Sequence, residues 1–283
     1  MAELLKGAPV ASAITDDLKT RCETLKSSGI SPCLAILRVG ERSDDIAYEK
    51  GAFKRCEKIG IDVRLFTLPA EAPKEEVLDA IRQINKDASI HGCLMFRPLS
   101  DRQTEAEACA LLDPRKDVDA MTMASLAGVF ACRDIGYPPC TAQAVIELLD
   151  HYQIPLEGKR VTVIGRSMVI GKPVSMMLQK RNATVTMCHT KTADLPAVCK
   201  NAEILVVAAG HAGVVDANYV SPDQVIIDVG INVDPEGNLC GDVRFDEVQP
   251  LVRAITPVPG GVGSVTTAVL CKHIIEAAEK TWK

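Results

Sequence analysis

The amino-acid sequence predicts an α/β protein with two α/β domains, the second of the Rossmann, dinucleotide-binding type. Three observations lead to this prediction. Apolar, strand-like runs alternate with amphipathic helical stretches from residue 33 onward. The alternation is interrupted once, between Pro98 and Pro139, and then resumes. The first strand after the interruption runs directly into a glycine turn, as strands do in dinucleotide-binding folds.

The first half of the chain has a β-α-β-α-β order. Cys33–Val39 is a continuous apolar run typical of a buried strand, and Ile46–Ile59 has helical periodicity that ends at Gly60, a common helix stop. The next strand, helix and strand are expected at Val63–Leu68, Lys74–Lys86 and His91–Phe96. This order predicts a parallel sheet with helices on both faces.

The second α/β domain is expected at residues 141–265. Its helices and strands are predicted at Thr141–Tyr152, Arg160–Ile164, Pro173–Lys180, Ala183–Met187, Ile204–Ala208 and Gln224–Val229, with a last helix at Val265–Trp282. The segment between Pro98 and Pro139 is rich in turn formers, so we expect an irregular stretch there. Irregular segments of that length usually carry function.

Composition excludes several classes of protein. The chain has 283 residues, a net charge of −5 and no run of Lys or Arg, which argues against a nucleic-acid or anionic-membrane partner. Its 11 cysteines are scattered without a Cys-x-x-Cys pair, so we expect neither a disulfide framework nor a metal site. No signal peptide and no apolar run of roughly 18 residues is present, so we expect a cytoplasmic protein.

The turn after Arg160–Ile164 is the candidate dinucleotide site. Gly165, Arg166 and Ser167 follow the strand, and Gly171 precedes the next helix. Glycines in such a turn let backbone N–H groups approach a pyrophosphate, which the helix N-terminus also attracts. The spacing is Gly-x5-Gly, which meets the usual Gly-x-Gly-x-x-Gly pattern only loosely. By itself it is also compatible with an ordinary tight turn.

The end of the second strand bears on the choice of nucleotide. Folds selective for NAD usually carry Asp or Glu there, which binds the ribose 2′-hydroxyl. This chain has Cys188-His189-Thr190-Lys191-Thr192, with no carboxylate. Arg166 and the Thr190 hydroxyl suit a 2′-phosphate, so we expect NADP, with NAD possible. The alternative for His189 and Lys191 is that they line a solvated loop.

Several stretches in order along nearly the whole chain resemble the methylenetetrahydrofolate dehydrogenase/cyclohydrolase family, often called FolD. They are Ser43-x4-Tyr48 leading to Gly60-Ile61, Lys116-Asp117-Val118-Asp119, Pro139-Cys140-Thr141, Gly165-Arg166-Ser167-x3-Gly171-x-Pro173, Ala183-Thr184-Val185-Thr186-x-Cys188-His189, Asp228-Val229-Gly230-Ile231-Asn232 and Thr256-Pro257-Val258-Pro259-Gly260-Gly261-Val262-Gly263. The combination is far more specific than any single glycine motif.

This resemblance implies two α/β domains that flank a cleft, and a homodimer. Residues 1–140 with 266–283 would form the folate-binding catalytic domain and residues 141–265 the NADP-binding domain. It implies NADP contacts from Gly165, Arg166, Ser167, Thr190 and Ile231. It implies that Tyr48 and Asp119 are catalytic, and that tetrahydrofolate derivatives bind Tyr48, Phe96, Arg97, Pro98, Asp119, Pro259, Gly260 and Gly261.

The implied folate contacts have a physical rationale and a plainer alternative. Tyr48 offers a flat face to an aromatic ring, or is a half-buried packing residue. Asp119 can accept paired hydrogen bonds from a pterin-like amino edge, or stabilises its own loop. Pro259-Gly260-Gly261 lets backbone approach a ligand, or is a simple turn.

Two departures from the family pattern bear on activity. Members with both activities have Tyr-x3-Lys and Gly-x-Leu-Val-Gln-Leu-Pro-Leu-Pro, whereas this chain has Ala52 at the Lys and Phe96 at the Gln. Lys50 and Lys54 lie roughly 200° and 240° around the helix from Tyr48. Hydride transfer mainly needs alignment, but hydrolysis of the methenyl product needs an activated water and a proton shuttle.

We therefore expect oxidation of 5,10-methylenetetrahydrofolate to 5,10-methenyltetrahydrofolate, with cyclohydrolase activity lost or weak. One alternative is a bifunctional enzyme that uses Lys54 or Arg97. Another is a non-catalytic folate- or nucleotide-binding protein, which the retained Tyr48, Asp119 and dinucleotide turn disfavour. A hydroxy-acid dehydrogenase would need an Arg beside a catalytic His, and no such arrangement is evident among the five histidines.

Overall fold

The computed structural model describes residues 2–282, whose contacts divide the chain into two compact units. Residues 13–140 and 267–282 form one, here called the three-stranded unit, and residues 2–12 and 141–266 form the other, the six-stranded unit. The last helix thus groups with the first half of the chain. Residues 2–12 group with 141–266 because strand β1 (Glu3–Leu4) pairs in parallel with β11 (Ala254–Ile255).

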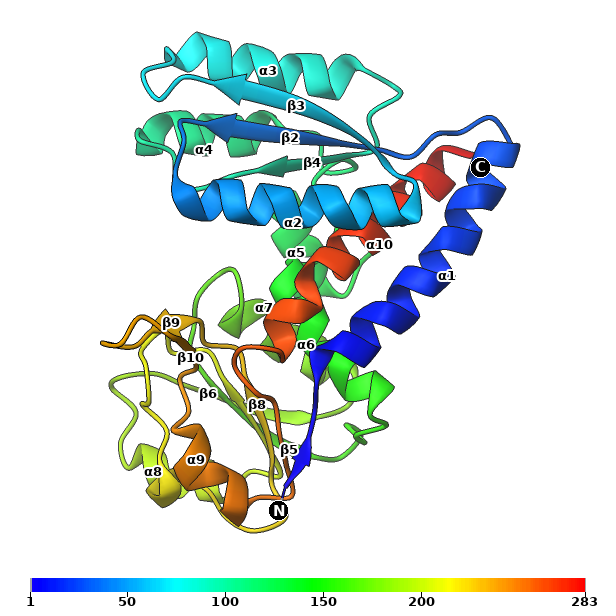
Figure 1. Ribbon diagram of the computed structural model, residues 1–283. Helices are drawn as coiled ribbons and strands as arrows, with labels where there is room; N and C mark the ends of the chain where they lie inside the picture. Colours follow the sequence, from blue (N-terminus) through cyan, green and yellow to red (C-terminus); the bar gives the residue numbers. More distant parts are fainter. Residues whose placement is uncertain (1, 283) are drawn as a thin grey trace. The chain divides into compact units, whose positions relative to one another are not determined.

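The three-stranded unit contains a parallel sheet in the order β3-β2-β4 (Figure 1). Its strands are β2 (Cys33–Val39), β3 (Asp62–Leu68) and β4 (Gly92–Met95). Helices α2 (Ser43–Ile59) and α3 (Lys74–Lys86) are the two crossover connections, and right-handed crossovers in opposite directions place them on opposite faces. Helix α2 ends at Gly60, which has a positive φ of 95° and closes the last turn.

The stretch expected to be irregular contains two helices, α4 (Arg102–Leu111) and α5 (Met123–Ala131). That expectation was wrong, because the helices are specified at their ends rather than by periodicity. Asp101 accepts the backbone N–H groups of residues 103 and 104, and Thr122 accepts that of residue 125. Helix α10 (Thr266–Trp282) and the part of α1 (Gly7–Ser27) from residue 13 onward complete the unit. No helix within residues 2–282 is apolar over a membrane-spanning length.

The six-stranded unit has a wholly parallel sheet in the order β1-β11-β8-β7-β5-β6. Its remaining elements are α6 (Cys140–His151), β5 (Arg160–Ile164), α7 (Gly171–Lys180), β6 (Thr184–Cys188), α8 (Leu195–Lys200), β7 (Ile204–Val207), η1 (Ala217–Tyr219), β8 (Val225–Asp228), β9 (Asn232–Val233), β10 (Leu239–Cys240), α9 (Phe245–Val248), η2 (Gln249–Leu251) and η3 (Val262–Ser264). From β5 the chain goes outward to β6 and then crosses to β7. The order therefore reverses between β5 and β7, where doubly wound folds bind ligands.

Candidate functional site

The reversal point of the six-stranded sheet is occupied by Gly165, the first residue after β5. Gly165 has a φ of 129°, which disfavours other residues. A Cβ atom there would lie 2.2 Å from the carbonyl oxygen of Ala208, the first residue after β7. Only glycine allows this close approach at the carboxyl ends of β5 and β7, the place where a pyrophosphate would have to meet backbone.

The second glycine of the Gly-x5-Gly spacing packs against the first. A Cβ atom on Gly171 would lie 2.2 Å from the carbonyl oxygen of Gly165, so both residues must lack a side chain for α7 to start where it does. Ser167 lies between them and is exposed; its hydroxyl accepts the backbone N–H of Ile170 at 3.1 Å. The amino end of α7 is thereby held beside the turn, which favours a bound anion.

Arg166 and Thr190 lie at the same edge of the sheet. They follow β5 and β6, which are parallel neighbours with Ile164 opposite Cys188. Both side chains are exposed, and residues 188–192 contain no carboxylate. His189, by contrast, accepts the backbone N–H of Lys191 within its own loop. The edge therefore carries a cation and a hydroxyl, the two groups that the sequence analysis assigned to a 2′-phosphate.

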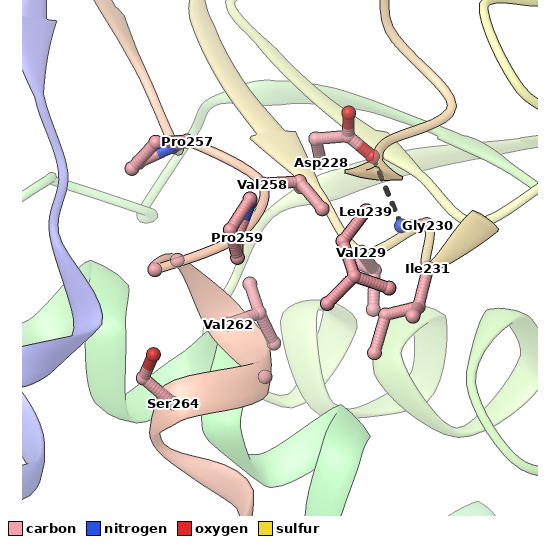
Figure 2. Close-up of a pocket in the computed structure, with 13 residues that line it drawn as sticks. Asp228, Val229, Gly230, Ile231, Leu239, Pro257, Val258, Pro259, Val262 and Ser264 are labelled. Atoms are coloured by element: carbon pink, nitrogen blue, oxygen red, sulfur yellow. Dashed lines mark hydrogen bonds between the residues drawn. The ribbon is translucent and has the colours of Figure 1, made fainter. Parts of the chain in front are cut away.

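A second group of predicted residues lines one cavity of about 230 Å³ in the same unit (Figure 2). Ile231, 66% exposed, lies on one wall, and the loop of Pro259, Gly260 and Gly261 forms the other. The backbone N–H of Gly7 donates to the Gly260 carbonyl at 2.8 Å and ties this loop to the start of α1. The structure thus brings together one predicted cofactor residue and three predicted folate residues.

Two buried carboxylates that the sequence analysis did not assign hold the Ile231 loop in place. Asp228 accepts the backbone N–H of Gly230 at 2.9 Å, drawn in Figure 2, and also those of Asp242 and Val243. Asp242 accepts the backbone N–H groups of residues 209 and 210 and the Asn232 amide. Burial raises the pKa of Asp228 to about 6. The Asp-Val-Gly-Ile-Asn motif contained Asp228, but its partner Asp242 lies in no motif.

In the three-stranded unit, Tyr48 and Phe96 form an aromatic pair. Their ring centroids are 6.1 Å apart and the planes are nearly perpendicular, at 81°. Phe96 directly follows β4, and the next peptide bond, Arg97–Pro98, is cis. Pro98 is exposed, whereas Tyr48, Phe96 and Arg97 are half-buried. Ala52, at the position of the family's Lys, is fully buried.

Asp119 is held by the start of α6. Its carboxylate accepts the backbone N–H of Cys140 at 2.8 Å. Burial raises the pKa of Asp119 above its usual range, although this hydrogen bond and the positive charge of Arg97 act in the opposite direction. The charge of Arg97 therefore acts on Asp119, and the two predicted substrate residues belong to one electrostatic environment.

Two residues that the sequence analysis did not assign to the site, Asp117 and His273, position Asp119. Asp117 is fully buried and accepts the backbone N–H groups of residues 121 and 122 and the Ser125 hydroxyl, at 2.6–2.8 Å. His273 on α10 pairs through Nδ1 with the Val118 carbonyl at 2.9 Å. The Lys-Asp-Val-Asp motif signalled Asp117 as a second carboxylate, but nothing local indicated a histidine 155 positions away along the chain.

The parallel sheet, its reversal point and the glycine turn define an α/β protein with a dinucleotide-binding unit. Family comparison agrees. Residues 5–119 match the catalytic domain of tetrahydrofolate dehydrogenase/cyclohydrolase, and residues 139–282 match its NAD(P)-binding domain. The chain belongs to the tetrahydrofolate dehydrogenase/cyclohydrolase family.

Relatives of this chain include well-covered sequences and solved structures. A protein of Carboxydothermus hydrogenoformans named bifunctional protein FolD is 53% identical, over 99% of this chain and 98% of its own length. The bifunctional FolD enzyme of Campylobacter jejuni is 35% identical with a TM-score of 0.95, over 99% of this chain and 100% of its own. The Trypanosoma brucei enzyme, solved with NADP and an inhibitor, is 31% identical with a TM-score of 0.93. The match covers 100% of this chain and 99% of the Trypanosoma brucei chain.

Proposed function

We propose that this protein oxidises 5,10-methylenetetrahydrofolate to 5,10-methenyltetrahydrofolate, with NADP as hydride acceptor. The observation that carries the proposal is the glycine contact at the reversal point, where Gly165 meets Ala208 beside an edge with Arg166 and Thr190 and no carboxylate. That arrangement fits a pyrophosphate and a 2′-phosphate. The named FolD relatives and the NADP bound in the Trypanosoma brucei enzyme support the same assignment.

Residues of the three-stranded unit would hold the folate. The Tyr48 ring, braced by Phe96, offers a flat surface for an aromatic ring, and Asp119 offers carboxylate oxygens to a pterin amino edge. Bound NADP supplies the hydride-accepting ring, so the task of these side chains is alignment. Alignment alone supplies much of the rate of such a transfer. Homodimerisation, which the family implies, stays a prediction.

Loss of cyclohydrolase activity, expected from Ala52 and Phe96, is not supported by the comparisons. The relatives in Carboxydothermus and Campylobacter are both called bifunctional, which favours the alternative of a retained hydrolase. In this chain that activity would need another cation. Lys54 is exposed on α2, whereas Arg97 is half-buried and its charge acts on Asp119.

The second candidate function is therefore hydrolysis of the methenyl product with the help of Arg97. A guanidinium stays protonated, so Arg97 would stabilise an attacking hydroxide or a developing oxyanion rather than accept a proton. Asp119, whose pKa is raised by burial, is the neighbouring group able to exchange one.

Separate assays of the two half-reactions test these proposals. Purified protein is followed for reduction of NADP, and of NAD, with methylenetetrahydrofolate; decay of methenyltetrahydrofolate is followed without nucleotide. We expect NADP reduction by the wild type. Absence of reduction with either nucleotide would refute the dehydrogenase proposal and favour a binding protein.

Three variants resolve the hydrolase question. Arg97→Leu restores the family residue at that position and should abolish enzyme-dependent methenyl decay if Arg97 serves it, while Lys54→Ala, the matched control, should leave it unchanged. A wild type whose methenyl decay equals that of buffer shows a monofunctional dehydrogenase. In that case Ala52→Lys combined with Phe96→Gln should raise the decay rate.

A further inference from the structure

A cavity of about 630 Å³ lies in the three-stranded unit away from the proposed folate residues. It is lined by the end of α3, the residues before β4, the 114–116 and 134–137 loops and the end of α10. His91, which lines it, precedes β4, whereas Phe96 and Arg97 follow that strand. The two positions are roughly 16 Å apart along an extended chain. The volume is typical of a small-molecule site.

The side chains that line this cavity include more cations than carboxylates, although the chain as a whole is negatively charged. Lys86, Arg115, Lys116 and Lys280 line it together with a single carboxylate, Asp134, in a protein of net charge −5. The ammonium group of Lys116 has a structural role, since it donates hydrogen bonds to three backbone carbonyls at the end of α3. Lys280 pairs with Asp134 at 2.9 Å.

Two of these cationic side chains have N–H groups that are available to a ligand. Lys86 is exposed and makes no hydrogen bond or ion pair with any residue between 2 and 282. Arg115 uses Nε and Nη2 on Asp113, so its Nη1 has no partner within the same range. Lys86 and the Nη1 atom of Arg115 therefore have N–H donors available for an anion in the cavity.

The cavity also contains one buried hydroxyl without a hydrogen-bond partner in the part of the chain that the structure describes. The Tyr137 side chain is 4% exposed, and its hydroxyl has no hydrogen-bond partner among the described residues. Its ring is fixed, with Lys280 Nζ 4.8 Å from the centroid and His273 at 5.1 Å. His91 accepts the Cys33 N–H through Nδ1, so the neutral ring carries its proton on the other nitrogen. A buried unpaired hydroxyl is costly unless a bound group uses it.

We propose that this cavity binds a small organic anion, with its phosphate or carboxylate group held by Lys86 and Arg115 and a further oxygen accepting from Tyr137 and His91. Ile90, Pro114 and Ile135 supply an apolar wall for the body of the molecule. The site is separate from the proposed dehydrogenase chemistry and does not depend on it.

The test titrates the 283-residue chain with phenyl phosphate, benzoate and uncharged benzyl alcohol. The protein is first saturated with NADP so that the nucleotide site is filled. Calorimetry should show binding of at least one anion and at least tenfold weaker binding of benzyl alcohol. Tighter binding of phenyl phosphate than of benzoate identifies a phosphate ligand, and the reverse order identifies a carboxylate. Affinity should fall as salt is raised.

Variants locate the site. Lys86→Ala with Arg115→Ala should weaken anion binding at least tenfold, whereas Lys58→Ala with Arg82→Ala, which removes the same charges outside the cavity, should leave it unchanged. Tyr137→Phe should weaken binding about fivefold and, because it removes an unsatisfied hydroxyl, should raise the melting temperature of the free protein. The proposal would be overturned by any of three results. These are no binding of either anion at 10 mM, equal anion affinity in the two double variants, and a lower melting temperature for Tyr137→Phe.

Discussion

The pairing of His273 with the Val118 carbonyl makes the stability of the three-stranded unit depend on pH. Burial lowers the pKa of His273 to about 4, from an ordinary value of 6.5. The folded protein therefore keeps this ring neutral while the unfolded chain protonates it. Above about pH 6.5 this group does not affect the free energy of unfolding. As the pH falls from 6.5 toward 4, protonation of the unfolded chain lowers that free energy.

The size of the effect follows from the two pKa values. At pH 5 the preferential protonation of the unfolded chain lowers the free energy of unfolding by roughly 2 kcal/mol relative to pH 7.5. Its buried neighbours Cys140 and Tyr137 do not contribute in this range, because burial raises the pKa of both further above it.

His273→Asn isolates this contribution. The Asn amide can donate to the Val118 carbonyl much as Nδ1 does, but it does not titrate. Urea unfolding measures the free energy of unfolding of both proteins at pH 7.5 and at pH 5. The decrease from pH 7.5 to pH 5 should be larger in the wild type by roughly 2 kcal/mol, whatever the absolute stability of the variant. All other titrating groups are common to both proteins. An equal loss in the two would refute the buried, neutral state of His273.

Three further predictions concern the proposed sites. Gly165→Ala should weaken NADP binding at least tenfold, measured by calorimetry. It should also destabilise the six-stranded unit by about 2–4 kcal/mol, measured by thermal unfolding, because the new Cβ would overlap the Ala208 carbonyl at a positive φ. Thr190→Asp should shift preference from NADP toward NAD by at least tenfold in kcat/KM, with Thr190→Ser as control, since a carboxylate repels a 2′-phosphate. Asp117→Asn should destabilise the three-stranded unit by about 2–4 kcal/mol, because the amide leaves one of three buried donors unpaired. The same variant should raise the KM for the folate substrate and leave the Kd for NADP unchanged.

Elements with a strong local signal were predictable from sequence. Cys33–Val39, Lys74–Lys86 and Arg160–Ile164 were predicted with the bounds that the structure shows, since a continuous apolar run or a clear 3.6-residue period depends on neighbours in the chain. The glycine turn was located for the same reason. Helices α4 and α5 were missed because one is largely polar and the other has no polar face, which leaves little periodicity.

The sequence by itself determined the α/β class, the turn after β5 and the residues that resemble a folate site. Only the tertiary structure decided that residues 2–12 join the other half of the chain, that Gly165 contacts Ala208, and that His273 and Asp242 support loops far from them in sequence. The physical reason is that burial and hydrogen bonding between distant residues depend on which elements meet. No local pattern records that the Tyr137 hydroxyl has no hydrogen-bond partner among residues 2–282, because its surroundings exist only once α10 has packed beside it.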